Sequence, residues 1–164
     1  RTQRALGEME DLVTGFLWLA REARPNDELE LLAVVPEVAT LLEELEGRAR
    51  ARDLELVFQP AGDPQVAAPR SVVRIVLGNL LRNAVAHSDA GRVHVAVDDR
   101  RVTVTNPLLE GEQRPSDEPS FGFGLTIVRD LCRRFGWRLE LGSVGGEDFV
   151  ATVVLAPLEP NQKE

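Results

Sequence analysis

The stretch from residue 69 to residue 88 limits most strongly what this chain can fold into. Its apolar residues recur at the spacing of one buried helix face: Ile75, Val76, Leu80, Ala84 and Val85. Asn79 and Asn83 lie four residues apart beside that stripe, so a helix places both amides on the same side. A buried amide without a hydrogen-bond partner costs about 1–3 kcal/mol. The two amides therefore need polar protein neighbours or a polar ligand.

The asparagine pair has two interpretations. In the structural one, which is the commoner for such a pair alone, one amide caps or bridges to a neighbouring loop and the other faces solvent. In the ligand-binding one, amide oxygens take places around a hard cation such as Mg2+, which also holds phosphate oxygens and waters. The residues that surround the pair decide between them.

Asn79 begins the run Asn-Leu-Leu-Arg-Asn-Ala-Val-Ala-His-Ser. This run closely resembles the N box of the histidine-kinase-type ATPases, a superfamily shared with DNA gyrase, mismatch-repair ATPases and heat-shock chaperones. The resemblance implies that Asn83 holds the magnesium on ATP and that Asn79 supports the phosphate side. It also implies that His87 lies near the nucleotide.

A glycine-containing segment at residues 121–125 is the second signal. Glycines let a backbone approach a phosphate closely, and the N-terminus of the following helix offers free N–H groups. A lone Gly-x-Gly is weak evidence, because many helices begin after a glycine for steric reasons. Its distance after the N box resembles that of the second glycine box of the same ATPases. That resemblance implies ATP contacts from Gly122, Phe123, Gly124 and Leu125.

The chain departs from the family at the first glycine box, where the family has Asp-x-Gly-x-Gly at the end of a strand. Here a predicted strand over 102–105 ends in Asn106, followed by Pro107 and Leu108. The resemblance implies that Asn106 takes the place of the adenine-binding Asp. An amide oxygen still accepts a hydrogen bond from the adenine amino group, although charged acceptors bind roughly twice as strongly.

A phosphate counter-charge is missing at Ala86, where the family has a basic residue. Arg114, in the short lid between Asn106 and Gly122, is a candidate to replace it. A solvated loop arginine is the commoner interpretation of such a residue.

Hydrophobic periodicity predicts the remaining elements. Helices are expected over 2–23, 36–52, 69–88 and 122–136, and strands over 28–33, 54–59, 65–67, 92–97, 101–105, 138–143 and 148–155. Residues 106–120 contain several prolines and charges and are expected to form a loop. This order predicts an α+β fold, a two-layer sandwich of a mixed sheet with its helices on one face.

The first predicted helix has a wide apolar stripe and ends at Pro25. It resembles the second helix of the histidine kinase dimerisation hairpin; the alternative is a helix that folds back onto its own domain. The only histidines, His87 and His94, do not precede such a helix, so we expect the phosphoacceptor to lie outside this chain. The expected organisation is a partial hairpin over 1–26, a catalytic ATP-binding domain over 27–158 and a disordered tail over 159–164.

Composition limits the classes of binding partner and of protein to which this chain can belong. The net charge of −8 argues against nucleic acid or an anionic membrane as the main partner. The single Cys132 excludes an internal disulfide, and its apolar neighbours predict a buried, inert thiol. No apolar run is long enough to span a bilayer. The chain begins at Arg1 without Met, so we expect a piece of a longer protein.

The resemblance implies the ATP-binding catalytic domain of a bacterial two-component sensor histidine kinase. Such a domain presents ATP and Mg2+ to a histidine, here one outside the chain, so catalysis is positioning and charge neutralisation with no catalytic residue in this chain. A response regulator, a homodimer and a cytoplasmic segment of an inner-membrane kinase are implied with it. One alternative is a degenerate interaction module, which Asn106, Leu108 and Ala86 favour. Another is an anti-sigma-factor-type serine kinase on the same fold, which the dimerisation-like helix disfavours.

Overall fold

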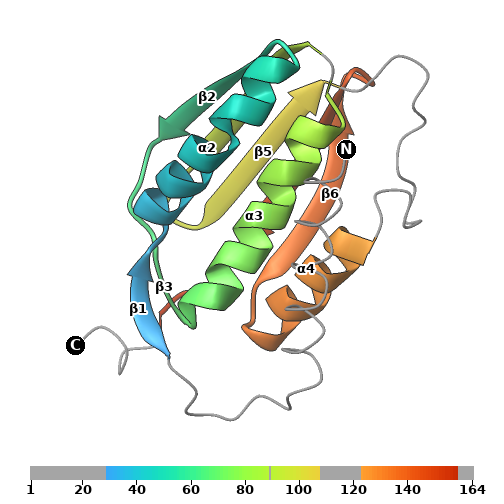
Figure 1. The fold of residues 1–164 in the computed structure, drawn as a ribbon. Helices are drawn as coiled ribbons and strands as arrows, with labels where there is room; N and C mark the ends of the chain where they lie inside the picture. The colour runs from blue at the N-terminus through green and yellow to red at the C-terminus, as the bar shows by residue number, and fades with distance from the viewer. Residues whose placement is uncertain (1–28, 89, 108–122, 159–164) are drawn as a thin grey trace.

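The structure is a computed structural model that describes residues 29–88, 90–107 and 123–158 (Figure 1). The predicted helix over 2–23, the lid with Arg114 and Gly122, and the tail over 159–164 lie outside the described residues. The described elements, in chain order, are β1 (Glu30–Ala33), α2 (Val34–Ala51), β2 (Leu54–Pro60), β3 (Gln65–Ala68), α3 (Arg70–Ala86), β4 (Gly91–Val97), β5 (Arg101–Pro107), α4 (Phe123–Arg134), β6 (Arg138–Val144) and β7 (Asp148–Val154).

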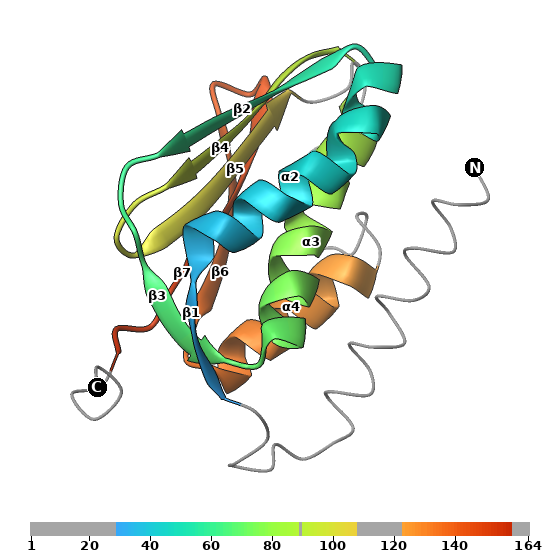
Figure 2. The ribbon, with the colours of Figure 1, turned by 60° about the vertical axis from the view of Figure 1, so that its left-hand side comes forward.

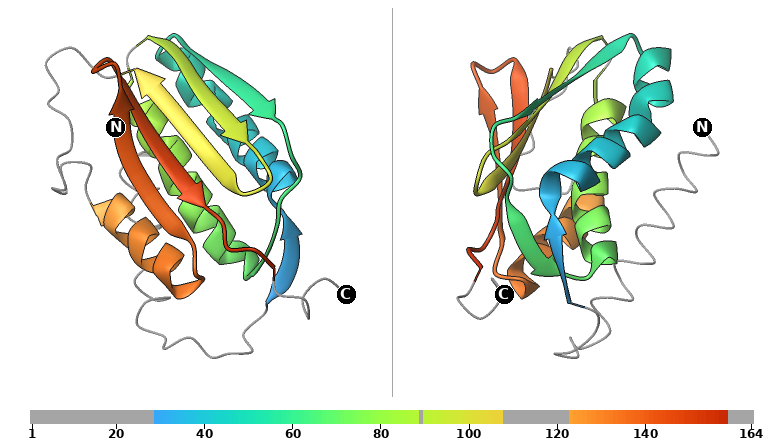
Figure 3. Two further views of the ribbon diagram at one scale, coloured as in Figure 1. Left: turned by 180° about the vertical axis from the view of Figure 1, so that it is seen from behind. Right: turned by 90° about the vertical axis from the view of Figure 1, so that its left-hand side faces the viewer.

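A five-stranded sheet of order β2-β4-β5-β7-β6 forms one layer of the molecule. The β2–β4 pair is parallel, and the other neighbouring strands are antiparallel. The described helices form the second layer, with α2 over β2, α3 over β5 and α4 over β6. Figure 3 shows the sheet from behind and from its edge, with these helices on one face only. The predicted α+β sandwich with a mixed sheet is confirmed.

Alternation along the central strands fills the space between the layers. Residues of one parity are buried: Val93, Val95 and Val97 on β4; Val102, Val104 and Asn106 on β5; Phe149, Ala151 and Val153 on β7. Their neighbours along each strand point to the other face of the sheet, as the two-residue period of a strand requires. Asn106 is therefore on the helix-facing side of the sheet, in line with two core valines.

Helix α3 is the central helix of its layer. It begins after Pro69, whose φ of −61° suits the residue before a first helical turn. It buries more than the single stripe that its sequence predicts, because α2 and α4 pack on either side of it. Its buried residues are Val72, Val73, Ile75, Val76, Leu77, Gly78, Leu80, Leu81, Ala84 and Val85.

An ion-pair cluster joins the N-terminal end of α3 to the preceding elements. Arg70 donates to the carboxylate of Glu37 on α2 and lies 3.6 Å from that of Glu30 on β1. Glu37 is 6% exposed, so its charge is withdrawn from water and depends on Arg70. This cluster ties three elements together at one end of the domain.

The structure corrects three details of the prediction. Strands β1 and β3 pair with each other, Leu31 opposite Ala67, in a separate two-stranded sheet beside the main one (Figure 2). Strand β5 continues through Asn106 and Pro107, because both pair with β7. Helix α4 spans Phe123–Arg134, slightly shorter than the predicted helix over 122–136, and Gly124 lies in its first turn. The local hydrophobic period does not encode the two strand pairings, because each depends on a partner strand elsewhere in the sequence.

Cys132 lies on α4 with no exposed surface, and burial raises the pKa of its thiol to about 12. A thiol of this kind carries almost no thiolate at neutral pH and reacts poorly. The prediction that Cys132 is buried is confirmed, and its raised pKa agrees with the expectation of an unreactive thiol. None of the described helices combines the length and the hydropathy that crossing a bilayer requires.

Candidate functional site

Asn79 and Asn83 lie one turn apart on α3, at the border between its buried face and its surface. Both are partly exposed, whereas Leu80 and Ala84 beside them are buried. The Nδ2 atom of Asn79 is itself buried and has no hydrogen-bond partner among the residues that the structure describes. An unpaired buried amide is rare in folded proteins, so this atom lacks the partner that most buried amides have.

The side chain of Asn83 makes no hydrogen bond to another residue in the described ranges, while its backbone oxygen accepts from the N–H of His87 at 3.0 Å. The amide is thus left available although the backbone around it is held. Within the described residues no cluster of three or more His, Cys, Asp or Glu side chains could hold a metal ion. A hard cation would fit here through an amide oxygen, ligand phosphate oxygens and waters.

Arg82 is a basic residue of this helix that the sequence analysis did not single out. A methyl group added at Gly78 would lie 3.0 Å from both Nη1 and Nη2 of Arg82, so the guanidinium folds back over that glycine. Its Nε and Nη2 atoms are buried. A glycine four residues before an arginine on one helix was the available signal. The arrangement holds a positive charge beside the row of Asn79 and Asn83.

Asn106 stands at the end of β5 and is 2% exposed. Its Nδ2 donates to the backbone oxygen of Pro107 at 3.0 Å. This hydrogen bond turns the nitrogen end of the amide toward Pro107 and leaves Oδ1 as the end that can accept. The side chain therefore offers Oδ1 as an acceptor, which suits a ligand amino group, while one Nδ2 hydrogen is held by the oxygen of Pro107.

The connection from α3 to β4 lies against the same end of β5. His87 follows α3 as its C-cap and is partly exposed, and Ser88 is fully buried, with its Oγ donating to the oxygen of Ala84 at 2.6 Å. A methyl group added at Gly91 would lie 3.6 Å from Cγ of Pro107. The structure thus brings His87 and the Asn106 end of β5 to the same edge of the domain.

The start of α4 completes the described part of the site. Phe123 and Gly124 occupy its first turn, and Leu125 is 9% exposed within the core. Helix α4, which these residues begin, packs against α3, the helix that carries Asn79 and Asn83 (Figure 1). Gly122 and Arg114 lie outside the described residues.

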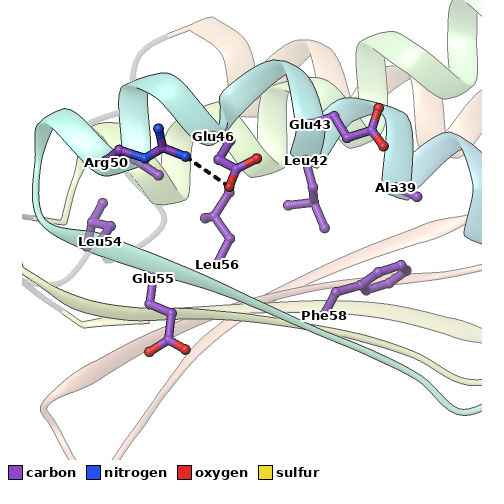
Figure 4. Close-up of a pocket in the computed structure, with 10 residues that line it drawn as sticks. Ala39, Leu42, Glu43, Glu46, Arg50, Leu54, Glu55, Leu56 and Phe58 are labelled. Carbon is purple, nitrogen blue, oxygen red and sulfur yellow. Dashed lines mark hydrogen bonds and ion pairs between the residues drawn. The ribbon is translucent and has the colours of Figure 1, made fainter.

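A separate groove of about 480 Å³ lies between α2 and β2 (Figure 4). Leu42 from α2 and Phe58 from β2 line it from opposite sides, and the ion pair of Glu46 with Arg50, at 3.3 Å, lies on the α2 side (Figure 4). None of the residues predicted to bind ATP lines this groove. It is distinct from the candidate site on α3.

Two curated relatives align with most of the chain. The phosphate regulon sensor protein PhoR of Pseudomonas aeruginosa is 26% identical over 186 aligned positions, which cover 99% of this chain and 42% of that protein. The adaptive-response sensory kinase SasA of Synechococcus is 28% identical over 167 positions, which cover 87% of this chain and 44% of that protein. The chain spans less than half the length of either relative.

Solved structures share the fold. The cytoplasmic segment of the histidine kinase QseC matches with a TM-score of 0.75 at 18% identity, over 93% of this chain and 95% of that one. A nucleotide-free catalytic domain of the histidine kinase ThkA matches with a TM-score of 0.64 at 22% identity, over 80% of this chain and 99% of that one.

The sequence profile of one family matches residues 69–159, more than half of the chain. The matched range begins at the residue before α3 and contains Asn79, Asn83 and Asn106 together with α4. The chain belongs to the family of histidine kinase-, DNA gyrase B- and HSP90-like ATPases.

Proposed function

We propose that this chain is the ATP-binding catalytic region of a sensor histidine kinase, spanning about residues 27–158 after a partial dimerisation helix over 1–26. ATP with Mg2+ binds between α3, the Asn106 end of β5 and the start of α4. One observation carries the proposal: on the helix with the N-box sequence, the buried Nδ2 of Asn79 lacks a partner among the described residues, one turn from Asn83. A phosphate oxygen of the ligand would accept from it.

Each candidate residue has a role in this proposal. Asn83 contributes an amide oxygen to Mg2+, and Asn106 accepts from the adenine amino group through Oδ1. The backbone N–H groups of Gly122, Phe123, Gly124 and Leu125, around the start of α4, would donate to the phosphates. His87 borders the nucleotide from the α3–β4 connection. When bound, Mg2+ neutralises charge on the phosphate oxygens.

Arg82 is a source of the counter-charge that Ala86 does not supply. Its guanidinium is held over Gly78, beside Asn79 on the next row of the helix surface. A fixed guanidinium suits phosphate recognition because its donors match phosphate oxygens and it stays charged at all physiological pH values. Arg114, in the lid, is the other candidate for this role.

The chain itself positions the γ-phosphoryl group in line with a histidine that another segment supplies. His94 pairs with Thr105 inside the sheet and His87 caps α3, so neither lies on a helix hairpin. The matched relatives are a sensor protein and a sensory kinase. We infer from them a homodimeric kinase whose cytoplasmic segment relays phosphate to a response regulator, and we place that kinase at the inner membrane.

A nucleotide titration tests the proposal. Calorimetry with ATP should show binding that strengthens on addition of Mg2+, and GTP should bind more weakly because its six-position oxygen cannot donate to Asn106. Incubation with γ-labelled ATP should leave the chain unlabelled. Equal weak binding of both nucleotides would favour the degenerate interaction module, and acid-labile label on this chain would contradict the assignment of the phosphoacceptor to another segment.

A further inference from the structure

Arg52 joins the corner between α2 and β2 to the far end of α3. Its Nε donates to the backbone oxygen of Ser88 at 2.8 Å, and its Nη2 donates to that of Ala86 at 3.1 Å. Arg52 lies 36 residues before Ser88 and 34 residues before Ala86 in the sequence. One planar guanidinium thus holds two carbonyls at the end of one helix.

The C-terminal end of α3 has no basic residue of its own in its last turn. The last carbonyls of a helix lack intrahelical donors and carry partial negative charge, so a cation placed there stabilises the end. Ser88 is fully buried, which removes its neighbourhood from water. Arg52 supplies from another element the donors and the charge that this helix end requires.

The two carbonyls that Arg52 holds lie on either side of His87 in the sequence. The connection they belong to leads into Gly91, which pairs with Leu54, two residues after Arg52. Asp53, between Arg52 and Leu54, has a φ of 54°, a left-handed conformation that non-glycine residues seldom adopt. At this corner the chain turns from α2 into β2, beside the start of β4. From the corner, the side chain of Arg52 reaches the C-terminal end of α3.

We propose that Arg52 is a positioning residue of the nucleotide site. By holding the oxygens of Ala86 and Ser88, it orients His87 and the end of α3 relative to Asn106, without contacting the nucleotide. The inference rests on the function proposed above. Because the guanidinium holds two acceptors with fixed geometry, a lysine would retain the charge but reach only one of them.

Substitution of Arg52 gives the first test, with Arg50 as a matched control. Arg50 is near the same end of α2, but its ion pair with Glu46 is exposed, so it has no part in orienting α3. Arg52→Ala should weaken MgATP binding about tenfold, as loss of an outer-shell partner commonly does. The MgATP affinity of Arg52→Lys should fall between those of Arg52→Ala and the unmodified chain. Arg50→Ala should bind MgATP as the unmodified chain does. Equal affinities for Arg52→Ala and Arg50→Ala would overturn the proposal.

A double-mutant cycle with His87→Ala separates positioning from general loss of stability. If Arg52 acts through His87, the two affinity losses should be clearly non-additive. Additive losses would mean that Arg52 acts on the fold alone and would overturn the proposal. Should Arg52→Ala fail to fold, Arg52→Lys takes its place in the cycle.

The histidine signals in NMR spectra of the nucleotide-free chain provide a readout that does not require ATP binding. The chain has two histidines, so His94 on β4 is an internal reference. Arg52→Ala should shift or broaden the imidazole signals of His87 and leave those of His94 unchanged, while Arg50→Ala should change neither. Unchanged His87 signals would overturn the positioning role. A chain that shows the His87 shift but binds no ATP would contradict the proposed function and leave the positioning geometry supported.

Discussion

Two regions of α3 differ in whether their buried polar side chains have partners within the protein. At the N-terminal end, Arg70 pairs with Glu37 and Glu30, so the buried carboxylate of Glu37 is neutralised by another part of the protein. Toward the C-terminal end, the buried Nδ2 of Asn79 has no partner in the described part of the chain, and Asn83 makes no side-chain hydrogen bond there. The polar side chains at the N-terminal end of α3 are thus paired within the protein, whereas the buried Nδ2 of Asn79 has no partner in the described part of the chain.

Under the proposed function, this difference separates polar groups that serve stability from polar groups that serve binding. Proteins satisfy nearly all buried polar groups, and exceptions concentrate where a ligand completes the set. A variant at the Arg70 end should therefore change the free energy of unfolding and leave affinity alone. A variant at the asparagine end should do the reverse.

Asn83→Ala should have the largest effect and would break the comparison if it failed. We expect magnesium-dependent ATP affinity to fall by on the order of a hundredfold, because a metal ligand and its orientation are lost. The free energy of unfolding should change by less than about 1 kcal/mol, since the side chain is partly exposed and leaves no core cavity. Calorimetry with and without Mg2+, beside thermal unfolding, checks both. A steep fall in melting temperature with affinity retained would support the structural interpretation of the asparagine pair.

Arg70→Ala should give the converse result at the other end of the helix. The carboxylate of Glu37, whose side chain is 8% exposed, would remain buried without its main counter-ion. We expect a loss of about 2–3 kcal/mol in unfolding free energy, because removing one member of a buried pair is strongly destabilising. Denaturant unfolding measures this loss, and ATP affinity should stay unchanged.

Arg74→Ala is the matched control for Arg70→Ala. Its ion pair with Glu44 is 2.9 Å long but exposed on both sides, so its removal should cost no more than about 0.5 kcal/mol. A larger loss from Arg74→Ala than from Arg70→Ala would mean that burial does not distinguish these two pairs.

Asn106→Asp sharpens the comparison at a residue where both roles meet. The substitution replaces the donor to Pro107 by a second acceptor, so a hydrogen bond is lost at a site only 2% exposed. We expect a loss of about 1–2 kcal/mol in unfolding free energy. ATP affinity should tighten by no more than about 1 kcal/mol, with the preference for ATP over GTP retained. Unfolding and two-nucleotide titrations on both chains test this, and a variant more stable than the parent would contradict the local hydrogen bond.

Ionisation of Cys132 should have the smallest effect on the free energy of unfolding, and only at alkaline pH. Its pKa is raised from 9.0 to about 12 in the folded chain, so the folded and unfolded states bind equal numbers of protons only well below pH 9. Above that pH the unfolded thiol ionises first, which favours unfolding. The expected contribution is zero at pH 7 and a loss on the order of 1 kcal/mol at pH 10. Unfolding of the chain and of Cys132→Ala at both pH values measures it; an equal pH dependence in the two would rule out this role.

The sequence predicted most of the fold because its signals are local. Helix α3 follows from three- and four-residue spacing, and the strands from alternation, with boundaries within a few residues of those observed. The extension of β5 through Pro107 was missed because it depends on pairing with Asp148, which lies more than forty residues later. Burial of Glu37 was missed for the same reason, since its partner comes from another helix.

The candidate site divides in the same way. Sequence alone determined that Asn79 and Asn83 lie on one side of a helix, because the helical repeat sets that relation whatever the rest of the chain does. The tertiary structure decided that Asn106 faces the helix layer with its oxygen left to accept and that Arg52 reaches the end of α3. Those contacts depend on how the layers and corners pack together. No local periodicity encodes a side-chain contact between elements that are 36 residues apart.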